Sequence, residues 1–210
     1  VNFAVPTGNF GNVFAGYAAH KMGLPINQLF IGSNSNDILT RFFDSGTMAI
    51  NDVIPTLSPS MDIQISSNFE RLLFELYDRN GERVAATLSA FRKNGRFVVE
   101  DRVLQEACKM FRGERYTDKE TLALMASHYR ATGDLLDPHT AVGVAVGRQF
   151  HKDKLCPIVT LATAHPAKFP VAVEMATNTR PMLPKQISDL FNREEHINLI
   201  DNDVSLVKEF

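Results

Sequence analysis

Tryptophan is absent from this sequence of 210 residues, and cysteine occurs only at Cys108 and Cys156. Two cysteines so far apart, without a Cys-x-x-Cys pair, argue against a disulfide framework and a zinc site, and they indicate a reducing compartment such as the cytoplasm. An excess of one charge is also lacking, because 22 basic residues accompany 24 acidic ones. A chain so balanced has no electrostatic signature for general binding of nucleic acids or acidic lipids.

A long hydrophobic run is lacking as well. The first charged side chain is Lys21, but Pro6, Gly8 and several asparagines interrupt the uncharged stretch before it, which also has no basic start. We therefore expect neither a membrane span nor a signal peptide. Because the chain opens with Val1, inside what reads as a strand, we also expect it to be a piece of a longer protein.

Short apolar stretches alternate with amphipathic ones along most of the chain. The expected strands cover residues 1–6, 28–32 and 156–162, and the expected helices cover residues 12–22, 37–43, 139–150 and about 167–177. Strands and helices that alternate at this spacing predict an α/β fold with a parallel, doubly wound sheet.

The composition changes in the middle of the chain, where charged residues are concentrated. Residues 68–131 combine many charges with apolar side chains at helical spacing, as at Phe69, Leu72 and Leu76, which predicts an inserted helical subdomain. One short strand, at 98–100, is expected within it. Residues 1–67 and 132–185 would then form the α/β domain, and residues 186–210 a more polar tail.

A glycine-rich turn between the first strand and the first helix is the strongest functional signal. It reads TGNFGN and contains Gly8, Asn9, Phe10, Gly11 and Asn12. Glycines at a helix start permit positive φ angles and close approach, and they leave backbone N–H groups free to bind phosphate. The alternative is that the glycines serve only a tight turn.

The turn does not match the motifs for nucleotides. A dinucleotide site requires G-x-G-x-x-G and an acidic residue after the second strand, whereas here the spacing is G-x-x-G and the strand leads into Ser33 and Asn34. A P-loop signature is also missing. The expected ligand therefore carries a single phosphate group.

Two further segments contain candidate ligand-binding residues. Thr163 follows the last predicted strand, where its hydroxyl can reach a heterocycle nitrogen, unless it merely begins a turn. Ser66, Ser67, Asn68 and Arg71 lie at the start of a predicted helix, where they can hold an anion or simply cap the helix. No metal-binding or serine-hydrolase motif accompanies them.

Several blocks of this sequence resemble the threonine synthases of bacteria and fungi. The blocks read VPTGNFGNVFAGYAAHKMGLPI, SNSNDILTRFF, TLSPSMDIQISSNFERLLFEL, LDPHTAVGVAV and TLATAHPAKFP, and they span about 1–77 and 134–175. The resemblance implies the C-terminal portion of a pyridoxal phosphate enzyme of fold type II, similar to the β subunit of tryptophan synthase. Such enzymes convert O-phospho-L-homoserine and water to L-threonine and phosphate, the last step of threonine biosynthesis.

The resemblance also assigns roles to the candidate residues. It implies that Gly8, Asn9, Phe10, Gly11 and Asn12 hold the cofactor phosphate and that Thr163 faces the pyridine nitrogen. Ser66, Ser67, Asn68 and Arg71 are candidates for the substrate side. A hydroxyl beside the nitrogen leaves it largely unprotonated, which moderates the cofactor as an electron sink.

One part of the family pattern is missing. The family binds its cofactor through a lysine in a Phe-Lys-Asp-type motif before the glycine turn, and no lysine here has that context. We expect this lysine upstream of Val1, no catalytic residue within the 210, and no turnover by this stretch alone. Two alternatives stay open, namely another lyase or dehydratase of the same fold type and a non-catalytic relative that binds a phosphorylated ligand.

Overall fold

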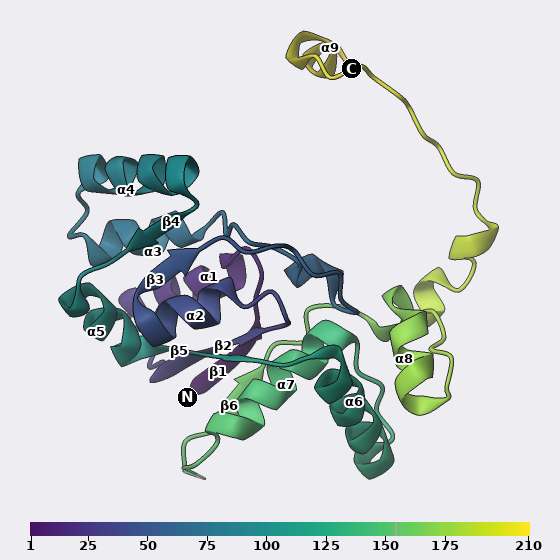
Figure 1. Cartoon of the computed structure of the whole chain (residues 1–210). Helices are drawn as coiled ribbons and strands as arrows, with labels where there is room; N and C mark the ends of the chain where they lie inside the picture. Colours follow the sequence, from purple (N-terminus) through teal and green to yellow (C-terminus); the bar gives the residue numbers. More distant parts are fainter. Residues whose placement is uncertain (154) are drawn as a thin grey trace.

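A four-stranded parallel sheet forms the centre of the computed structural model, which describes residues 1–153 and 155–210. The strand order is β5–β2–β1–β6 (Figure 1). The strands are β1 (Asn2–Pro6), β2 (Gln28–Ser33), β5 (Phe111–Arg115) and β6 (Ile158–Thr160). Their carboxyl ends share one edge, the usual position of ligands in open α/β sheets. The parallel α/β architecture predicted from the sequence is confirmed.

Helices cover both faces of this sheet. The larger ones are α1 (Gly11–Lys21), α2 (Ile38–Ser45), α3 (Phe69–Leu76), α4 (Gly81–Asn94), α5 (Asp101–Met110), α6 (Asp118–Thr132), α7 (Pro138–Phe150) and α8 (Pro170–Thr177). Ala4 and Phe30 pack with Val146 of α7, whereas Val5 and Ile31 belong to the core shared with α1 and α2. Because side chains alternate along a strand, strands buried on both faces become almost continuously apolar.

Helix α7 lies unusually close to the two strands at one side of the sheet. A Cβ at Gly143 would be 2.9 Å from Pro6 Cδ and 3.0 Å from Thr160 Cγ2. A Cβ at Gly147 would be 3.1 Å from Thr160 Oγ1 and 3.2 Å from the Cβ of Ala4. Glycine at these two positions therefore allows α7 to rest directly on β1 and β6, which pair with Asn2 opposite Ile158 and Ala4 opposite Thr160.

The charge-rich segment 68–131 is not wholly helical, so this expectation is wrong at one end. Its last part contains β5, an edge strand of the main sheet that pairs with β2. The short strand expected at 98–100 is instead β4 (Arg96–Val98), which pairs with β3 (Thr47–Ala49) in a separate antiparallel pair. Buried side chains of α3, α4 and α5 join the same core as β1 and β2. The other domain boundaries inferred from composition, after residues 67 and 185, remain a prediction.

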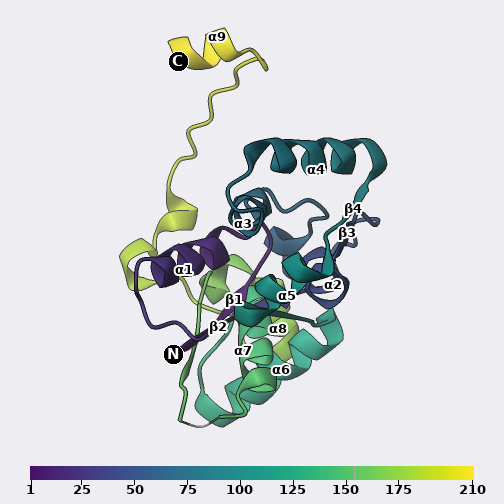
Figure 2. The same ribbon diagram turned by 90° about the vertical axis from the view of Figure 1, so that its left-hand side faces the viewer.

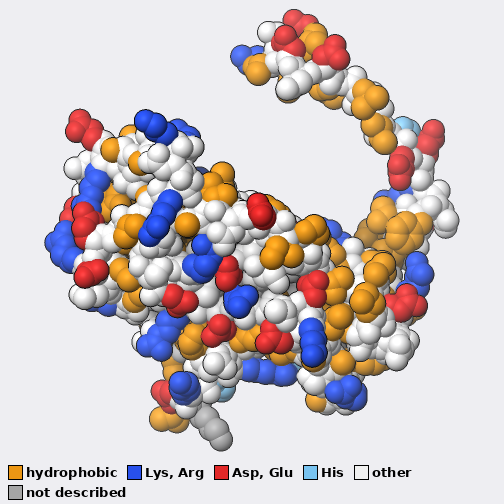
Figure 3. Space-filling view, viewed as in Figure 1, with side chains coloured by type: hydrophobic (Ala, Val, Ile, Leu, Met, Phe, Trp, Pro, Cys, Tyr) orange, Lys and Arg blue, Asp and Glu red, His pale blue; other side chains and the backbone are white. Residues whose placement is uncertain are grey.

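The chain after α8 leaves the body of the protein. It contains η3 (Lys185–Ile187), η4 (Leu190–Asn192) and a terminal helix, α9 (Val204–Glu209). Figures 1 and 2 show this tail extending far from the sheet. Its apolar side chains are open to solvent, including Phe191 (82% exposed) and Leu199 (95% exposed), and Figure 3 shows them along its length. Among the described residues, no helix is both long and apolar enough to cross a membrane.

Candidate functional site

The turn between β1 and α1 presents free backbone amides at the carboxyl edge of the sheet. Phe10 is the N-cap residue of α1, and its side chain makes no capping hydrogen bond. Within the described part of the chain, the N–H groups of residues 8–13 donate no hydrogen bond. Asn9, Gly11 and Asn12 are exposed. Free amides at the positive end of a helix dipole form an anion-binding arrangement.

Phe10, rather than a glycine, supplies the unusual backbone conformation of this turn. Its φ angle is 63°, in the left-handed region, whereas Gly8 and Gly11 have no positive φ. The expectation that the glycines provide such angles is therefore wrong. The Phe10 ring is 1% exposed and packs edge-on against Phe69, with ring centroids 5.3 Å apart. Burial of the ring holds the residue in a conformation that is costly for a side chain with a Cβ.

The two glycines of the turn differ in what surrounds them. A Cβ at Gly8 would lie 2.7 Å from the backbone oxygen of Ser60, so packing within the chain requires glycine there. A Cβ at Gly11 would meet only Asn68 Nδ2, at an ordinary distance of 3.6 Å. Nothing in the described chain therefore requires glycine at position 11, which leaves room for a ligand beside it.

Ser66 and Asn68 both bind the backbone of this turn. Ser66 Oγ donates to the carbonyl oxygen of Gly8 at 3.0 Å. The Asn9 carbonyl oxygen accepts from Asn68 twice, from its backbone N–H at 3.1 Å and from Nδ2 at 2.9 Å. Asn68 is the N-cap residue of α3, yet its side chain makes no capping bond. The segment 66–68 therefore lies against the turn rather than apart from it.

Thr163 lies just beyond the neighbouring strand. Leu161 N–H still donates to the Ala4 carbonyl, which extends the β1–β6 pairing by one step. Thr163 follows two residues later and is exposed. Since β1 and β6 are adjacent and parallel, Thr163 and the turn after β1 occupy the same edge of the sheet. The placement expected from the sequence is therefore found.

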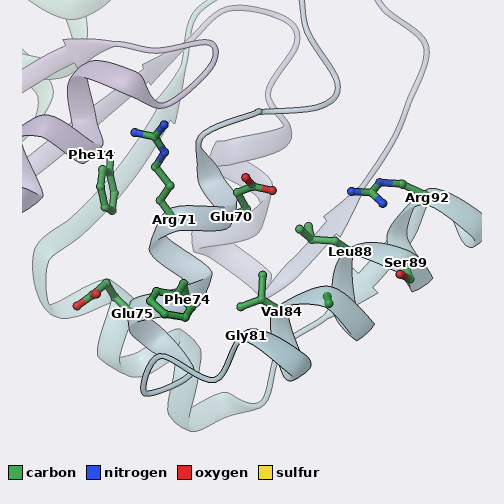
Figure 4. Close-up of a pocket in the computed structure, with 11 residues that line it drawn as sticks. Phe14, Glu70, Arg71, Phe74, Glu75, Gly81, Val84, Leu88, Ser89 and Arg92 are labelled. Atoms are coloured by element: carbon green, nitrogen blue, oxygen red, sulfur yellow. The ribbon is translucent and has the colours of Figure 1, made fainter.

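Arg71 and Ser67 border cavities beside α3. Arg71 lines a cavity of about 570 Å³ between α3 and α4 and extends beside the ring of Phe14, with its guanidinium carbon 5.9 Å from the ring centroid (Figure 4). Ser67 is exposed and lines a second cavity of about 380 Å³. Phe14 belongs to the first turn of α1, so the larger cavity adjoins the helix that begins at the candidate site.

A buried group of polar residues lies behind the site and was not predicted. Asp137 Oδ1 accepts from His139 N–H and contacts His139 Nδ1, both at 2.9 Å, and Thr140 also donates to this carboxylate. Burial by itself raises the pKa of Asp137, but the hydrogen bonds from His139 and Thr140 outweigh it and hold the pKa below its usual range. Asp-Pro in the sequence indicated only a helix start.

His139 connects this group to the turn. Ser60 N–H donates to His139 Nε2 at 3.3 Å, so Nε2 is the acceptor and the ring proton resides on Nδ1, facing Asp137. The carbonyl oxygen of the same Ser60 is the atom that approaches Gly8. The group therefore fixes the backbone on which Gly8 packs. In the part of the chain covered by the structure, no cluster of three or more His, Cys, Asp or Glu is arranged to bind a metal.

Asp62 connects two of the sequence blocks named above, SNSNDILTRFF and TLSPSMDIQISSNFERLLFEL, through its carboxylate. Its Oδ1 accepts from Asn34 Nδ2 at 2.7 Å, from Asn36 Nδ2 at 3.0 Å and from Thr56 Oγ1 at 2.6 Å. Its Oδ2 accepts from Thr56 N–H at 2.9 Å. The network ties the turn after β2 to the loop that carries Ser60, which helps hold the polar edge of the sheet.

Fold and site together define an α/β protein with free amides and a hydroxyl at the carboxyl edge of a parallel sheet, which suits a phosphorylated ligand. The family model "Threonine synthase, C-terminal" matches residues 140–210. A threonine synthase from Pseudomonas aeruginosa is 49% identical over 211 residues, which cover 100% of this chain and 45% of that protein.

Solved structures of threonine synthases also match the whole of this chain. A threonine synthase from Brucella melitensis, described as bound to PLP, matches 100% of this chain and 45% of its own, with 47% identity and a TM-score of 0.92. A threonine synthase from yeast matches 100% of this chain and 46% of its own, with 40% identity and a TM-score of 0.90.

This chain belongs to the threonine synthase family and corresponds to the C-terminal part of its members. It spans a little under half the length of the relatives it matches. The family and the fold class predicted from the sequence are therefore confirmed.

Proposed function

We propose that this chain binds the phosphate of pyridoxal 5′-phosphate through the free amides of residues 8–12 and faces the pyridine nitrogen with Thr163. The observation that supports the proposal is the run of free N–H groups at the start of α1, on the same sheet edge as Thr163. The open space beside Gly11 fits a ligand group there. The Brucella relative of nearly the same fold is itself described as PLP-bound.

The reaction we propose for the whole protein is the conversion of O-phospho-L-homoserine and water to L-threonine and phosphate. The cofactor, when bound, supplies the electron sink that this β,γ-elimination and hydration require. In this chain the amides of residues 8–12 would hold the cofactor by its phosphate, and the Thr163 hydroxyl would lie beside the ring nitrogen and leave it largely unprotonated. The supporting observation is the shared family of the relatives named threonine synthase.

Arg71 and Ser67 are our candidates for the substrate side. Arg71 is the cation of the 570 Å³ cavity closest in sequence to the turn-binding segment 66–68, and guanidinium groups pair well with phosphate and carboxylate. Ser66 and Asn68 were candidates for the substrate side as well, but their side chains donate to carbonyl groups of the turn instead.

The experiment compares ligands and substrates on a full-length protein that contains this segment. We expect tighter binding of pyridoxal 5′-phosphate than of pyridoxal, and release of phosphate from O-phosphohomoserine but no deamination of serine or threonine. Equal affinity for the two forms of the cofactor would refute the phosphate site, and deamination in place of phosphate release would favour a dehydratase.

The 210 residues alone are expected to show no turnover. No lysine among them stands in a Phe-Lys-Asp-type context, so the covalent bond to the cofactor cannot form as in the family. A phosphate-release assay on this stretch, run beside the full-length protein, checks the expectation. Turnover at a rate similar to that of the full-length protein would overturn it.

A further inference from the structure

We propose that Ser66 and Asn68 are positioning residues, which aim the amides of the glycine-rich turn by holding the carbonyl groups on its opposite side. The inference rests on the proposed function, because it concerns how the proposed phosphate site is built. It assigns to both side chains a role that differs from contact with substrate.

The contacts are specific to the peptide units of the turn. Ser66 Oγ donates to the Gly8 carbonyl at 3.0 Å, and Asn68 donates to the Asn9 carbonyl at 3.1 Å from its backbone and at 2.9 Å from Nδ2. Two consecutive carbonyls are therefore fixed by one short segment that is 58 and 59 residues away in the sequence.

Because a peptide unit is planar, a contact that fixes its carbonyl group also fixes the direction of its N–H group. In a trans peptide unit, the C=O and the following N–H point to opposite sides. The Gly8 carbonyl shares its unit with the Asn9 N–H, and the Asn9 carbonyl shares its unit with the Phe10 N–H. Holding both carbonyls against residues 66–68 therefore turns both N–H groups to the other side, where they donate to no described residue.

The turn requires such support because its conformation is strained. Phe10 has a φ of 63°, and it caps α1 without a side-chain hydrogen bond. Burial of the Phe10 ring fixes one end of the turn, and Ser60 packs against Gly8 at the other. Between them, the hydrogen bonds from Ser66 and Asn68 restrain the Gly8 and Asn9 carbonyls within the described part of the chain, so their loss would let these peptide units rotate.

Two competing roles fit the contacts less well. Helix capping by Asn68 is contradicted, because its side chain makes no capping bond to α3. Direct binding of a phosphate dianion by Ser66 conflicts with its chemistry, because a hydroxyl has one hydrogen and this one is donated to Gly8. The lone pairs that remain on Ser66 would repel an anion.

The test measures how strongly the full-length protein prefers pyridoxal 5′-phosphate over pyridoxal, as the ratio of the two dissociation constants. Ser66→Ala and Asn68→Ala are each expected to lower this preference about three- to tenfold, the effect of one lost hydrogen bond. The affinity for pyridoxal should stay unchanged. The ³¹P resonance of the bound cofactor should also move towards its position in free solution.

Matched variants separate positioning from general damage. Ser66→Thr keeps the hydroxyl and should retain the wild-type preference. Ser127→Ala removes a hydroxyl that donates to a carbonyl on α6, and Asn80→Ala removes the cap of α4, so both lose comparable contacts far from the turn. Neither control should change the preference.

The outcomes distinguish this inference from the proposed function. If the wild-type protein binds both forms of the cofactor equally, the phosphate site itself is wrong. If the wild type prefers the phosphorylated form and Ser66→Ala and Asn68→Ala keep that preference, the positioning role is wrong. A higher KM for O-phosphohomoserine with an unchanged preference would likewise overturn it, in favour of direct contact with substrate.

Discussion

Gly8 and Gly11 look equivalent in the sequence, yet the structure gives them different reasons to be glycine. Gly8 faces the Ser60 carbonyl at a distance that no Cβ tolerates, whereas Gly11 has an open side. The first is required by packing within the chain, and the second leaves space where the proposed phosphate would bind. Neither serves for a positive φ, which belongs to Phe10.

Alanine at each position should therefore separate stability from ligand binding. Gly8→Ala is expected to lower the free energy of unfolding by roughly 1–3 kcal/mol, because a backbone atom must move. Gly11→Ala should leave it unchanged or raise it by up to about 1 kcal/mol, since alanine favours the helix, while it weakens the binding of pyridoxal 5′-phosphate. Urea denaturation and cofactor titration on the full-length protein measure both effects. A destabilised Gly11→Ala protein would contradict the distinction.

At the scale of elements, α7 depends on a buried charge at its first turn. Asp137 accepts the N–H groups of His139 and Thr140 and is 1% exposed. Its pKa is lowered in the folded protein, while in the unfolded chain it has the ordinary value near 3.9. Its contribution to stability is therefore complete above about pH 4 and is lost as the pH falls through the lower, folded value.

Asp137→Asn should remove this dependence on pH. At neutral pH we expect the variant to lose roughly 1–3 kcal/mol of stability, because an amide group accepts fewer of these hydrogen bonds. As the pH falls below about 4, the difference between variant and wild type should shrink. Chemical denaturation from pH 3 to 7 measures this difference in the free energy of unfolding, with Asp52→Asn as a control at an exposed carboxylate. A difference that grows on acidification would refute the assignment.

The sequence predicted the two central strands and the edge strand β6, but it missed β5 at the other edge of the sheet. Residues 1–6 and 28–32 are apolar runs next to amphipathic helices, so their parallel pairing followed from the pattern. β5 reads FRGER, which lacks an apolar run because only Phe111 is buried. Its place in the sheet depends on pairing with β2 and on packing against α2, which are long-range effects that local patterns do not contain.

Local patterns in the sequence also predicted part of the candidate site, whereas its long-range contacts could not be predicted. The turn at residues 8–12 and Thr163 carry local signals, because glycines at a helix start and a polar residue after a strand have known roles. The support from Ser66 and Asn68, and the Asp137–His139–Ser60 connection, join residues far apart in sequence. Only the folded chain shows that these donors face the carbonyls of the turn.

At the scale of the whole molecule, much apolar surface is uncovered. The tail after α8 exposes Met182 (85%), Phe191 (82%) and Leu199 (95%), and the edge strand β6 exposes Val159 (44%). Surface of this kind marks contact with other protein. The match with the Brucella protein covers 100% of this chain, tail included, within a chain about twice as long.

Produced alone, residues 1–210 should therefore associate. We expect species larger than a monomer in light scattering and strong binding of a hydrophobic dye. Removal of residues 186–210 should lower the dye signal, because most of the exposed apolar tail is lost. A monodisperse monomer that binds no dye would show that the exposed apolar surfaces do not cause association.

The pairing of β1 with β6 also sets a length. The turn after β1 and Thr163 after β6 are the proposed contacts for the phosphate and the ring nitrogen of the same rigid cofactor. A shift of one residue between the strands, about 3.3 Å, would therefore place one of the two contacts out of reach. Gly143 and Gly147 of α7 lie against both strands, because a Cβ at either position would crowd β1 and β6. A larger side chain at either glycine should thus displace one strand and weaken the binding of pyridoxal 5′-phosphate in a titration, although both positions lie on the opposite side of the strands from α1.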